Sequence, residues 1–409
     1  MNKLVLITNP GSASRKYALY SLSNNLDPSD KDGDNSDAVA LYQLHFETKG
    51  AKVVVTITDS DGKKSEQNTD LESLNDAISY VADFAKSNLD QSLDAVIVRI
   101  VAPGDYFTKN HIVDEEYMRE LKKAEKRNPV HVPTTANEIR GVKESFKDIK
   151  IISVSDSAFH WEKPDYTKYY SFSTSVADEA EIKRYGYHGL SYAFISRYMR
   201  SQGILPKKLI ACHLGSGSSV SAIKNGKALD NSMGYTPLEG VAMSTRVGTI
   251  DAAAALALKQ AKGIASDEEL LIYLNKKCGL YGLSNVSDDM RNIIAKATEG
   301  DERSALTLKI FYYRIKAYIG QMAADLNGAD ALVFAGTIGE RGAETRTAIA
   351  KDLGYLGFEL DEKKNDNPVF EQDGAPVRYA LISTKSSKPI YIVKTDETAE
   401  MLAQAKKLL

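Results

Sequence analysis

Two short segments rich in glycine and serine have the composition of phosphate-binding loops. One is Gly215-Ser216-Gly217-Ser218-Ser219, which follows an apolar run containing His213, and the other spans residues 9–16, NPGSASRK. Glycine lets the backbone curl so that successive N–H groups point at one place, and serine adds hydroxyl donors. Each segment lies between two strand-like runs, in a different half of the chain. Together they predict a nucleotide held between two domains.

Neither segment fits the commoner phosphate-binding motifs. The sequence contains no G-x-x-x-x-G-K-[ST]. Val220 stands where a dinucleotide fingerprint beginning at Gly215 needs its third glycine. A P-loop enzyme and a dinucleotide-binding enzyme are therefore disfavoured.

Histidines lie beside these segments and beside similar ones. Four of the six are in such positions, namely His131, His160, His188 and His213. A single histidine is usually a satisfied core residue, and no two here have the spacing of zinc ligands. His188 and His213 stand next to glycine turns, which favours a chemical role for both.

Three arginines, Arg99, Arg246 and Arg291, occur in comparable surroundings. A guanidinium binds phosphate or carboxylate bidentately, so the three indicate anion recognition, with surface salt bridges as the alternative for each. Arg99 interrupts the apolar run 94–104, where a charge needs a partner. It either bonds a structural carboxylate or meets an anion at the strand end.

Two carboxylates follow predicted strands. Asp156 comes directly after the apolar run 149–155, and Glu397 follows the last predicted strand, 390–393. Ligands of open α/β sheets bind at the carboxyl ends of strands. Carboxylates placed there serve as magnesium ligands or as a general base. A structural helix cap is the alternative for Asp156.

The elements that must position these residues alternate between strands and helices, and 409 residues exceed an ordinary single core. Two α/β domains are the prediction. A capping box at Ser266 predicts a helix that ends at Gly279. Its inward-facing residues are expected to be Leu270, Leu271, Leu274 and Cys278. A longer helix is predicted over residues 302–326, and a glycine turn over 336–342.

Bulk composition excludes several classes of protein. With 52 basic and 55 acidic side chains the formal charge is -3, so the basic surface of a nucleic-acid binder is missing. Only two cysteines are present, which fits a reducing cytoplasm and no disulfide framework. No apolar run approaches the roughly 20 residues of a membrane span. We expect a soluble cytoplasmic protein with no nucleic-acid or membrane partner.

Along nearly its whole length the sequence resembles the acetokinase family of the actin-like ATPase superfamily. Residues 8–16, TNPGSASRK, resemble the family's Asn-x-Gly-Ser-Ser-Ser-x-Lys segment, and residues 155–160, SDSAFH, match its Asp-Thr-Ala-Phe-His segment. Residues 184–191, RYGYHGLS, match Arg-Tyr-Gly-Phe-His-Gly-x-Ser. Residues 231–248, NSMGYTPLEGVAMSTRVG, match a long family signature almost residue for residue.

The resemblance implies a two-domain α/β protein of the actin-like ATPase fold, a duplicated ribonuclease-H-like core with an interdomain cleft. An N-terminal acetokinase domain would comprise residues 1–155 and 384–409, and a nucleotide-binding domain residues 156–383. The implied activity is that of an acetate kinase, which passes the γ-phosphoryl group of ATP reversibly to acetate, giving acetyl phosphate and ADP. Mg²⁺ is the expected metal, with Mn²⁺ as an alternative, and a homodimer is the expected assembly.

The resemblance also assigns roles to residues. Catalysis would fall to Arg99, Asp156, His188 and Arg246, of which His188 and Arg246 stabilise the transition state. The metal would be held by Asn9, Asp156 and Glu397, and the phosphate side by Asn9, Ser12, Ser14 and Lys16. The carboxylate substrate would contact Arg99, Val101, Val130, His131, Tyr187 and Pro237. The nucleotide would contact His213, Gly215, Ser216, Gly217, Ser218, Asp289, Met290, Arg291, Thr337, Ile338, Gly339 and Arg341.

Departures from the family pattern lie around the acyl and nucleoside sites. After Arg99 the chain reads IVAPG where the family has x-Val-His-Gly-Gly, and Thr337 and Arg341 replace a glycine and an asparagine. The alternatives are therefore a kinase for propionate or butyrate, a kinase with a non-ATP donor such as pyrophosphate, and a non-catalytic nucleotide-binding protein. Retention of the catalytic residues together with Glu397 argues against the last.

Overall fold

The chain forms two compact units. The computed structural model describes residues 2–11, 14–23, 38–50, 52–128 and 132–409. The first unit is Met1–Ala158 with Asp396–Leu409, and the second is Phe159–Thr395. Residues 384–395, which the sequence assigned to the first domain, belong to the second unit, because β16 (Ile390–Val393) pairs there in parallel with β12 (Ala331–Ala335).

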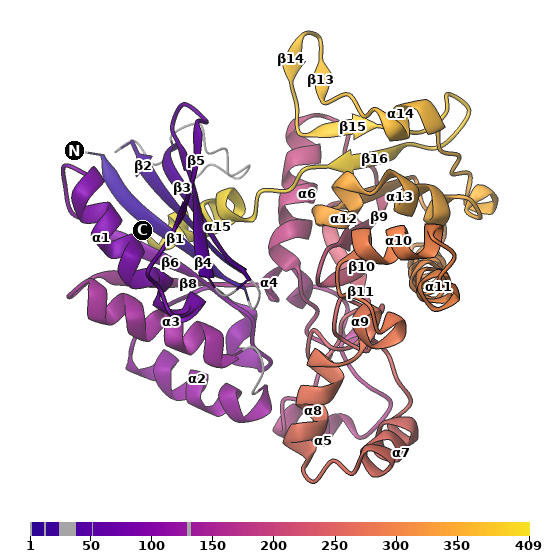
Figure 1. Cartoon of the computed structure of the whole chain (residues 1–409), viewed down its shortest axis with the longest axis horizontal. Coiled ribbons are helices and arrows are strands. Elements are labelled where there is room, and N and C mark those ends of the chain that lie inside the picture. Colours follow the sequence, from indigo (N-terminus) through magenta and orange to yellow (C-terminus); the bar gives the residue numbers. More distant parts are fainter. Residues whose placement is uncertain (1, 12–13, 24–37, 51, 129–131) are drawn as a thin grey trace. The chain divides into compact units, whose positions relative to one another are not determined.

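An eight-stranded mixed sheet forms the first unit, in the order β5-β4-β3-β2-β1-β6-β8-β7 (Figure 1). Neighbours from β1 to β5 are antiparallel, whereas β1, β6 and β8 run parallel. The strands are β1 (Lys3–Pro10), β2 (Ser14–Leu22), β3 (Ala38–Lys49), β4 (Lys52–Asp59), β5 (Lys64–Asn68), β6 (Ala95–Ile100), β7 (His111–Ile112) and β8 (Lys150–Ser155).

Helices pack on this sheet, with α3 and α15 each contacting β1 and β6. The helical elements are η1 (Leu74–Asp76), α1 (Ala77–Asn88), η2 (Asp105–Thr108), α2 (Glu115–Arg127), α3 (Val132–Ser145), α15 (Glu397–Ala405) and η5 (Lys406–Leu408). Because α15 begins at Glu397, the end of the chain delivers this carboxylate to the first unit.

The register of the parallel strands brings distant pieces of sequence together. Thr8 pairs with Val98, and Ile100 pairs with Ser155. Asn9, Arg99 and Asp156 therefore lie at the carboxyl ends of three neighbouring strands. This is the edge at which open α/β sheets bind ligands.

A six-stranded sheet forms the second unit, in the order β11-β10-β9-β12-β16-β15. Its further strands are β9 (Lys208–Leu214), β10 (Ser218–Lys224), β11 (Lys227–Asn231) and β15 (Tyr379–Leu381), and a separate pair is β13 (Glu371–Gln372) with β14 (Ala375–Pro376). The helical elements are η3 (Asp165–Thr167), α5 (Thr174–Glu179), α6 (Gly189–Ser201), α7 (Ala252–Lys262), α8 (Asp267–Lys276), α9 (Gly279–Ser284), α10 (Met290–Thr298), α11 (Glu302–Asp325), α12 (Gly336–Arg341), α13 (Ala343–Ala350), η4 (Gly354–Leu356) and α14 (Glu362–Asp366), with α4 (Ala158–Trp161) at the junction of the units.

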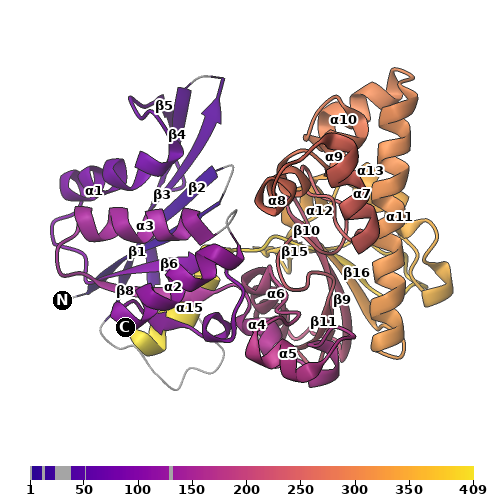
Figure 2. The ribbon, with the colours of Figure 1, turned by 90° about the horizontal axis from the view of Figure 1, so that it is seen from below.

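Helices α6 and α11 cover opposite faces of the second sheet. Leu209 and Ala211 of β9 pack in a cluster with α6, whereas Ile210 and Cys212 pack with α11. Successive strand residues point to opposite faces, so this alternation gives each helix its own apolar layer. Figure 2 shows the sheet between the two helices.

Both sheets contain the same five-stranded plan. In β3-β2-β1-β6-β8 and in β11-β10-β9-β12-β16, a three-stranded antiparallel meander is followed by two strands parallel to its first strand. Each glycine-serine segment joins the two strands of the meander that come first along the chain, β1 to β2 and β9 to β10. The predicted α/β fold with a duplicated core is confirmed.

Two local predictions were wrong. Residues 336–341, expected as a turn, form the short helix α12. Leu271, expected to face inward from α8, is 38% exposed, because α8 buries the face that carries Leu270 and Leu274 and Leu271 lies on another face. Among the described residues, both cysteines are free and no helix is long and apolar enough to cross a membrane.

Candidate active site

A cluster of polar residues surrounds Arg99 at the strand ends of the first unit. The Arg99 guanidinium lies 3.1 Å from the Asp156 carboxylate and 3.4 Å from the Glu397 carboxylate. It also donates a hydrogen bond to Oδ1 of Asn9 at 3.1 Å, and the Asn9 amide donates to Glu397 at 2.9 Å. Four residues predicted to share a site therefore meet at one place, although they come from four segments of the chain.

Electrostatics keep the Arg99 side chain charged. Burial opposes the charge, but the carboxylates of Asp156 and Glu397 outweigh it and raise the pKa of Arg99 above its usual value. Of the two readings that the sequence left open for Arg99, the structure shows the carboxylate pairing. Its partners are the residues predicted to hold the metal.

The first glycine-serine segment runs beside this cluster. Lys16 on β2 is exposed and is the register partner of Asn9 on β1. Ser14 begins β2, and Ser12 lies outside the described residues. The backbone of Lys16 therefore lies beside Asn9, which belongs to the Arg99 cluster.

The second segment, between β9 and β10, closes on itself as a tight loop. The Gly215 N–H donates to the Gly217 carbonyl at 3.0 Å, and the Ser218 hydroxyl donates to the Gly215 carbonyl at 3.1 Å. In the described part of the chain, the N–H groups of Ser216 and Gly217 make no hydrogen bond. Two backbone donors on a curled loop are what a phosphate oxygen requires.

His188 is held next to this loop by an unusual backbone conformation. Its φ of 58° and ψ of 26° place it in the left-handed region, where residues other than glycine are uncommon and often belong to functional sites. Its Nδ1 lies 2.9 Å from the Ser219 hydroxyl, which lies 2.7 Å from the Tyr192 hydroxyl. Ser219 and Tyr192 therefore fix the orientation of the His188 ring.

His213 packs against His188, with ring centroids 4.3 Å apart. Its Nδ1 lies 2.8 Å from the hydroxyl of Ser191 on α6. The start of α6 thus supplies a partner for each ring, Ser191 for one and Tyr192, through Ser219, for the other.

The position of Gly217 shows how closely His188 and Arg246 approach the loop. A Cβ atom added to Gly217 would lie 3.0 Å from Nε2 of His188 and 3.1 Å from Nη2 of Arg246. The other terminal nitrogen of Arg246 donates to the Pro237 carbonyl at 2.9 Å. An imidazole and a guanidinium therefore converge on a loop that has unused N–H donors.

We expect Gly217→Ala to lower kcat by about tenfold, because the added methyl group displaces His188 or Arg246 by a fraction of an ångström. Gly354→Ala is the matched control, since a Cβ there meets no atom within 4 Å. Steady-state kinetics on both variants is the measurement. Unchanged kcat in Gly217→Ala would show that the loop does not need this close approach.

His160, another of the histidines that the sequence singled out, has a structural role. Its buried ring donates from Nε2 to the Tyr187 carbonyl at 3.1 Å. Burial, and next the charge of Lys163, lower the pKa of His160 to about 3. The ring therefore stays neutral and braces the turn that carries His188.

The residues predicted for the nucleoside lie on α10 and α12. Asp289 caps α10, and its carboxylate pairs at 2.6 Å with Arg291, whose side chain is 89% exposed. Arg291 thus has the surface salt bridge that the sequence left as an alternative. A Cβ on Gly215 would lie 4.0 Å from the Thr337 nitrogen, so α12 begins beside the second loop. The adenosine contacts remain a prediction.

The predicted acyl contacts are distributed over both units. Val101 is half-buried after β6, in the first unit. In the second unit Tyr187 is buried and donates to the Tyr235 carbonyl at 2.7 Å, and Pro237 accepts from Arg246. Val130 and His131 lie outside the described residues. The acyl pocket remains a prediction.

Comparison with known proteins decides the family. Residues 4–404 match the acetokinase family. The acetate kinase of Thermoanaerobacterium thermosaccharolyticum is 36% identical, with 99% of this chain and 98% of that protein covered. The chain belongs to the acetokinase family. This acetokinase is also 35% identical to the acetate kinase of Methanosarcina acetivorans, over 94% of this chain and 95% of that one.

Solved structures agree with the sequence comparison. The acetokinase resembles the propionate kinase of Francisella tularensis with a TM-score of 0.84 at 29% identity, and the acetate kinase of Porphyromonas gingivalis with a TM-score of 0.77 at 30% identity. Each comparison covers 98% of both chains. The predicted class of enzyme, a phosphotransferase with a carboxyl group as acceptor, is confirmed.

Sequence reasoning missed the residues that orient the two histidines of the acetokinase. Ser191 and Tyr192 follow His188 by three and four positions, a spacing that places them one turn along α6. That spacing is a signal from which the sequence could have predicted them. No sequence signal predicts the partnership of His188 with Ser219, because it depends on a contact between α6 and β10.

Proposed function

We propose that this acetokinase transfers the γ-phosphoryl group of ATP reversibly to acetate, forming acetyl phosphate and ADP. The observation that carries the proposal is the convergence of His188 and Arg246 at Gly217, on a loop with unused N–H donors. Phosphoryl transfer needs positioning and stabilisation of charge on the equatorial oxygens, and little covalent chemistry. A fixed imidazole, a guanidinium and backbone N–H groups supply that stabilisation.

The Arg99 cluster fits the substrate carboxylate and a magnesium ion. Asp156, Glu397 and Asn9 present oxygen atoms, which Mg²⁺ prefers, and such sites use one or two carboxylates together with phosphate oxygens. Among the residues that the structure describes, no three His, Cys, Asp or Glu side chains are grouped so that they could hold a metal, so the protein would supply two carboxylates here. When bound, Mg²⁺ or Mn²⁺ would neutralise charge on the phosphate oxygens. Arg99 would orient the carboxylate of acetate.

The assembly and location of the enzyme belong to the same proposal. We place a homodimer in the cytoplasm, with a small carboxylate and a nucleotide as its partners, and without a nucleic acid or membrane partner. The composition and the cysteine content support the cytoplasmic location and the lack of a nucleic-acid partner, and the homodimer rests on the family resemblance. Propionate is the second candidate acceptor, because a solved structure at 0.84 TM-score is that of a propionate kinase.

Donor selectivity is expected to be relaxed. Thr337 and Arg341 of α12 replace the glycine and asparagine of the family pattern, and they lie on the helix that begins beside the second loop. A β-branched side chain and a long cation there alter the surface offered to the base. We expect GTP and ITP to support kcat/KM within about tenfold of ATP, a gap of roughly 1.4 kcal/mol. Strict ATP preference would contradict this expectation, and activity with pyrophosphate alone would overturn the nucleotide assignment.

One assay tests the proposed function. Acyl phosphate is trapped with hydroxylamine after incubation of the enzyme with acetate, propionate or butyrate and with ATP, GTP, ITP or pyrophosphate, at one magnesium concentration. We expect hydroxamate with ATP and acetate. Its formation from propionate or butyrate in preference to acetate would replace the acceptor. Its absence with every pair, although the protein is folded, would support a non-catalytic nucleotide-binding protein.

A further inference from the structure

A buried lysine lies in the second unit, three positions after His160. Lys163 follows α4, and its side chain is 0% exposed. Its Nζ has no hydrogen-bond partner among the residues that the structure describes, and the Asp230 carboxylate is 3.7 Å away. Burying an ammonium group without an acceptor is unfavourable. Its position therefore calls for an explanation.

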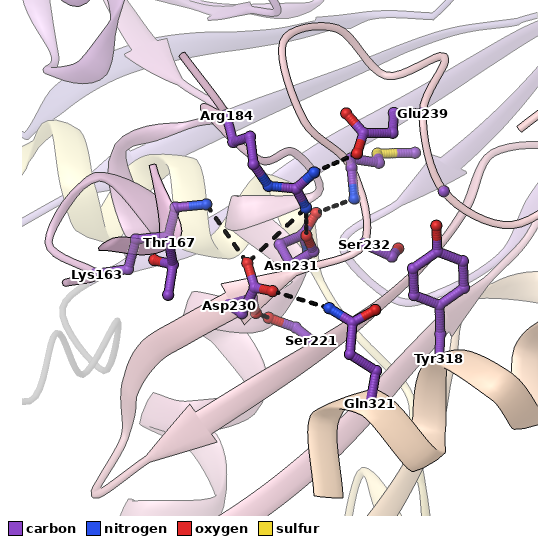
Figure 3. Close-up of polar contacts among 12 residues, drawn as sticks. Lys163, Thr167, Arg184, Ser221, Asp230, Asn231, Ser232, Glu239, Tyr318 and Gln321 are labelled. Atoms are coloured by element: carbon purple, nitrogen blue, oxygen red, sulfur yellow. Dashed lines mark hydrogen bonds and ion pairs between the residues drawn. The ribbon is translucent and has the colours of Figure 1, made fainter. Parts of the chain in front are cut away.

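Asp230 lies on β11 and is approached by two cations. Its Oδ1 is 3.7 Å from Nζ of Lys163 and 4.0 Å from Nη2 of Arg184, and it accepts no hydrogen bond from the described residues. Its Oδ2 accepts a hydrogen bond from Gln321 on α11 at 3.2 Å. Figure 3 shows Lys163 and Arg184 pointing at this carboxylate from different sides.

Arg184 is shared between Asp230 and a second carboxylate. It forms an ion pair and hydrogen bond with Glu239, and donates to the Asn231 carbonyl at 2.9 Å (Figure 3). The Glu239 carboxylate also accepts from the Tyr170 hydroxyl. A Cβ on Gly234 would overlap both the Glu239 carboxylate and the Tyr170 hydroxyl. Glu239 is therefore tightly packed where it holds Arg184.

The segment from Asn231 to Glu239 bonds Arg246 directly and bonds the turn that leads to His188. On one side the Gly234 carbonyl accepts from the N–H groups of Tyr185 and Gly186, at 3.0 and 3.2 Å, in the turn that begins at Arg184 and ends at His188. On the other side its Pro237 carbonyl accepts from Arg246. A shift of Arg184 relative to Glu239 would therefore change the position of His188 relative to Arg246.

We propose that Lys163 is a positioning residue for phosphoryl transfer. Its charge offsets that of Asp230, so Arg184 stays paired with Glu239. This pairing keeps His188 and Arg246 in their positions relative to each other. The proposal rests on the proposed function of those two residues. When Lys163 is neutral or absent, the Asp230 charge is unbalanced and attracts Arg184, because attraction between charges at these separations is strong in a buried site. Arg184 then leaves Glu239, and the turn to His188 moves with it.

Titration of Lys163 gives this device a pH dependence. Burial, only partly offset by Asp230, lowers the pKa of Lys163 to about 8, and Arg184 and Lys168 lower it while Glu239 raises it. His160 stays neutral in this range, and burial and next the charge of Glu239 raise the pKa of Tyr170, which keeps its proton. Asp325 on α11 also faces the cluster, and burial and next the charge of Asp230 raise its pKa. The charge on Lys163 is therefore present below pH 8 and lost above it, so the alkaline side of the rate profile should fall near that pH.

As the pH rises above about 8, the folded state should become more stable while the rate falls. An unfolded lysine keeps its proton to about pH 10.4. Because the folded-state pKa is lower, charged Lys163 destabilises the fold below pH 8, and this penalty disappears as the pH rises from about 8 to about 10.4. Removing Lys163 should thus make the protein more stable at pH 7 while making it slower. A residue with a purely structural role would lower both.

The test compares Lys163→Met, Asp230→Asn and the double variant, with Lys227→Gln as the control. Lys227 lies on β11 and pairs with Glu162 at the surface. Lys227→Gln therefore removes a positive charge from the same region without altering the buried cluster. We expect kcat of Lys163→Met to fall about tenfold at pH 7, with KM values within about twofold. Its Tm should exceed that of the wild type at pH 7, and the difference should shrink at pH 9.5.

The double variant provides the rescue. With Lys163 and Asp230 both uncharged, Arg184 stays on Glu239, so kcat should return to within about threefold of the wild type and lose its alkaline fall near pH 8. Unchanged kcat in Lys163→Met, or a loss that the double variant does not recover, would overturn the inference. A wild-type enzyme that forms no acyl phosphate would instead refute the proposed function, and the inference with it.

Discussion

Replacing Arg246 by alanine is expected to lower kcat at least about 10²-fold, the loss typical when one donor to a transition state is removed. Its guanidinium uses one terminal nitrogen to bond the Pro237 carbonyl and places the other at the second loop, beside His188. In the Arg246→Ala variant the loop keeps its backbone N–H donors, but the permanent positive charge of the guanidinium is lost. Steady-state kcat and KM for ATP and acetate are the measurement.

Arg246→Lys should recover little of this loss. A lysine ammonium is a point charge, and it cannot bond the Pro237 carbonyl and a phosphoryl oxygen in the fixed geometry of a guanidinium. Arg303→Ala, at an exposed arginine of α11, is the control for loss of a positive charge. Near-normal turnover in Arg246→Ala would remove this residue from the catalytic site.

Asp156→Asn and Glu397→Gln are each expected to raise the magnesium concentration for half-maximal rate by about 10- to 100-fold, the cost already typical of altering an outer-shell partner of a bound metal. Both carboxylates bond Arg99, and both amide replacements keep the shape of the side chain while removing its charge. The effect should appear in the magnesium dependence before it appears in KM for the nucleotide.

The control for the magnesium prediction is Glu66→Gln, which removes a carboxylate from β5 of the same unit, where it pairs with Lys49 at the surface. Rate is measured against magnesium concentration for all three variants. An unchanged magnesium dependence in both Asp156→Asn and Glu397→Gln would show that these carboxylates serve only to hold Arg99.

The sequence predicted which residues lie at the strand ends, while their roles in a site stay a prediction. Asp156 and Arg99 follow or interrupt apolar runs, and adjacent parallel strands place such residues at one sheet edge. Glu397 was also predicted, as a carboxylate that follows the last strand. In the structure it arrives because α15 packs on β1 and β6 of the first unit.

The polar cluster around Asp230 could not be read from the sequence. Lys163, Arg184 and Glu239 come from three separate segments, and no period or spacing links them. A lysine after a short helix is typical of a surface position, and tertiary packing buries it here. The boundary near residue 384 was wrong for a similar reason, because the partner of β16 is decided by sheet pairing and not by local pattern.

The most direct measurement is ³¹P NMR of the enzyme with ATP, acetate and magnesium. We expect the γ-phosphate signal of ATP to decline as signals of ADP and acetyl phosphate grow, and ATP to form when the enzyme is given ADP and acetyl phosphate. The Arg246→Ala variant should show the same conversion at a rate lower by at least about 10²-fold. Release of inorganic phosphate without acetyl phosphate, or no conversion in either direction by a folded protein, would contradict the assignment.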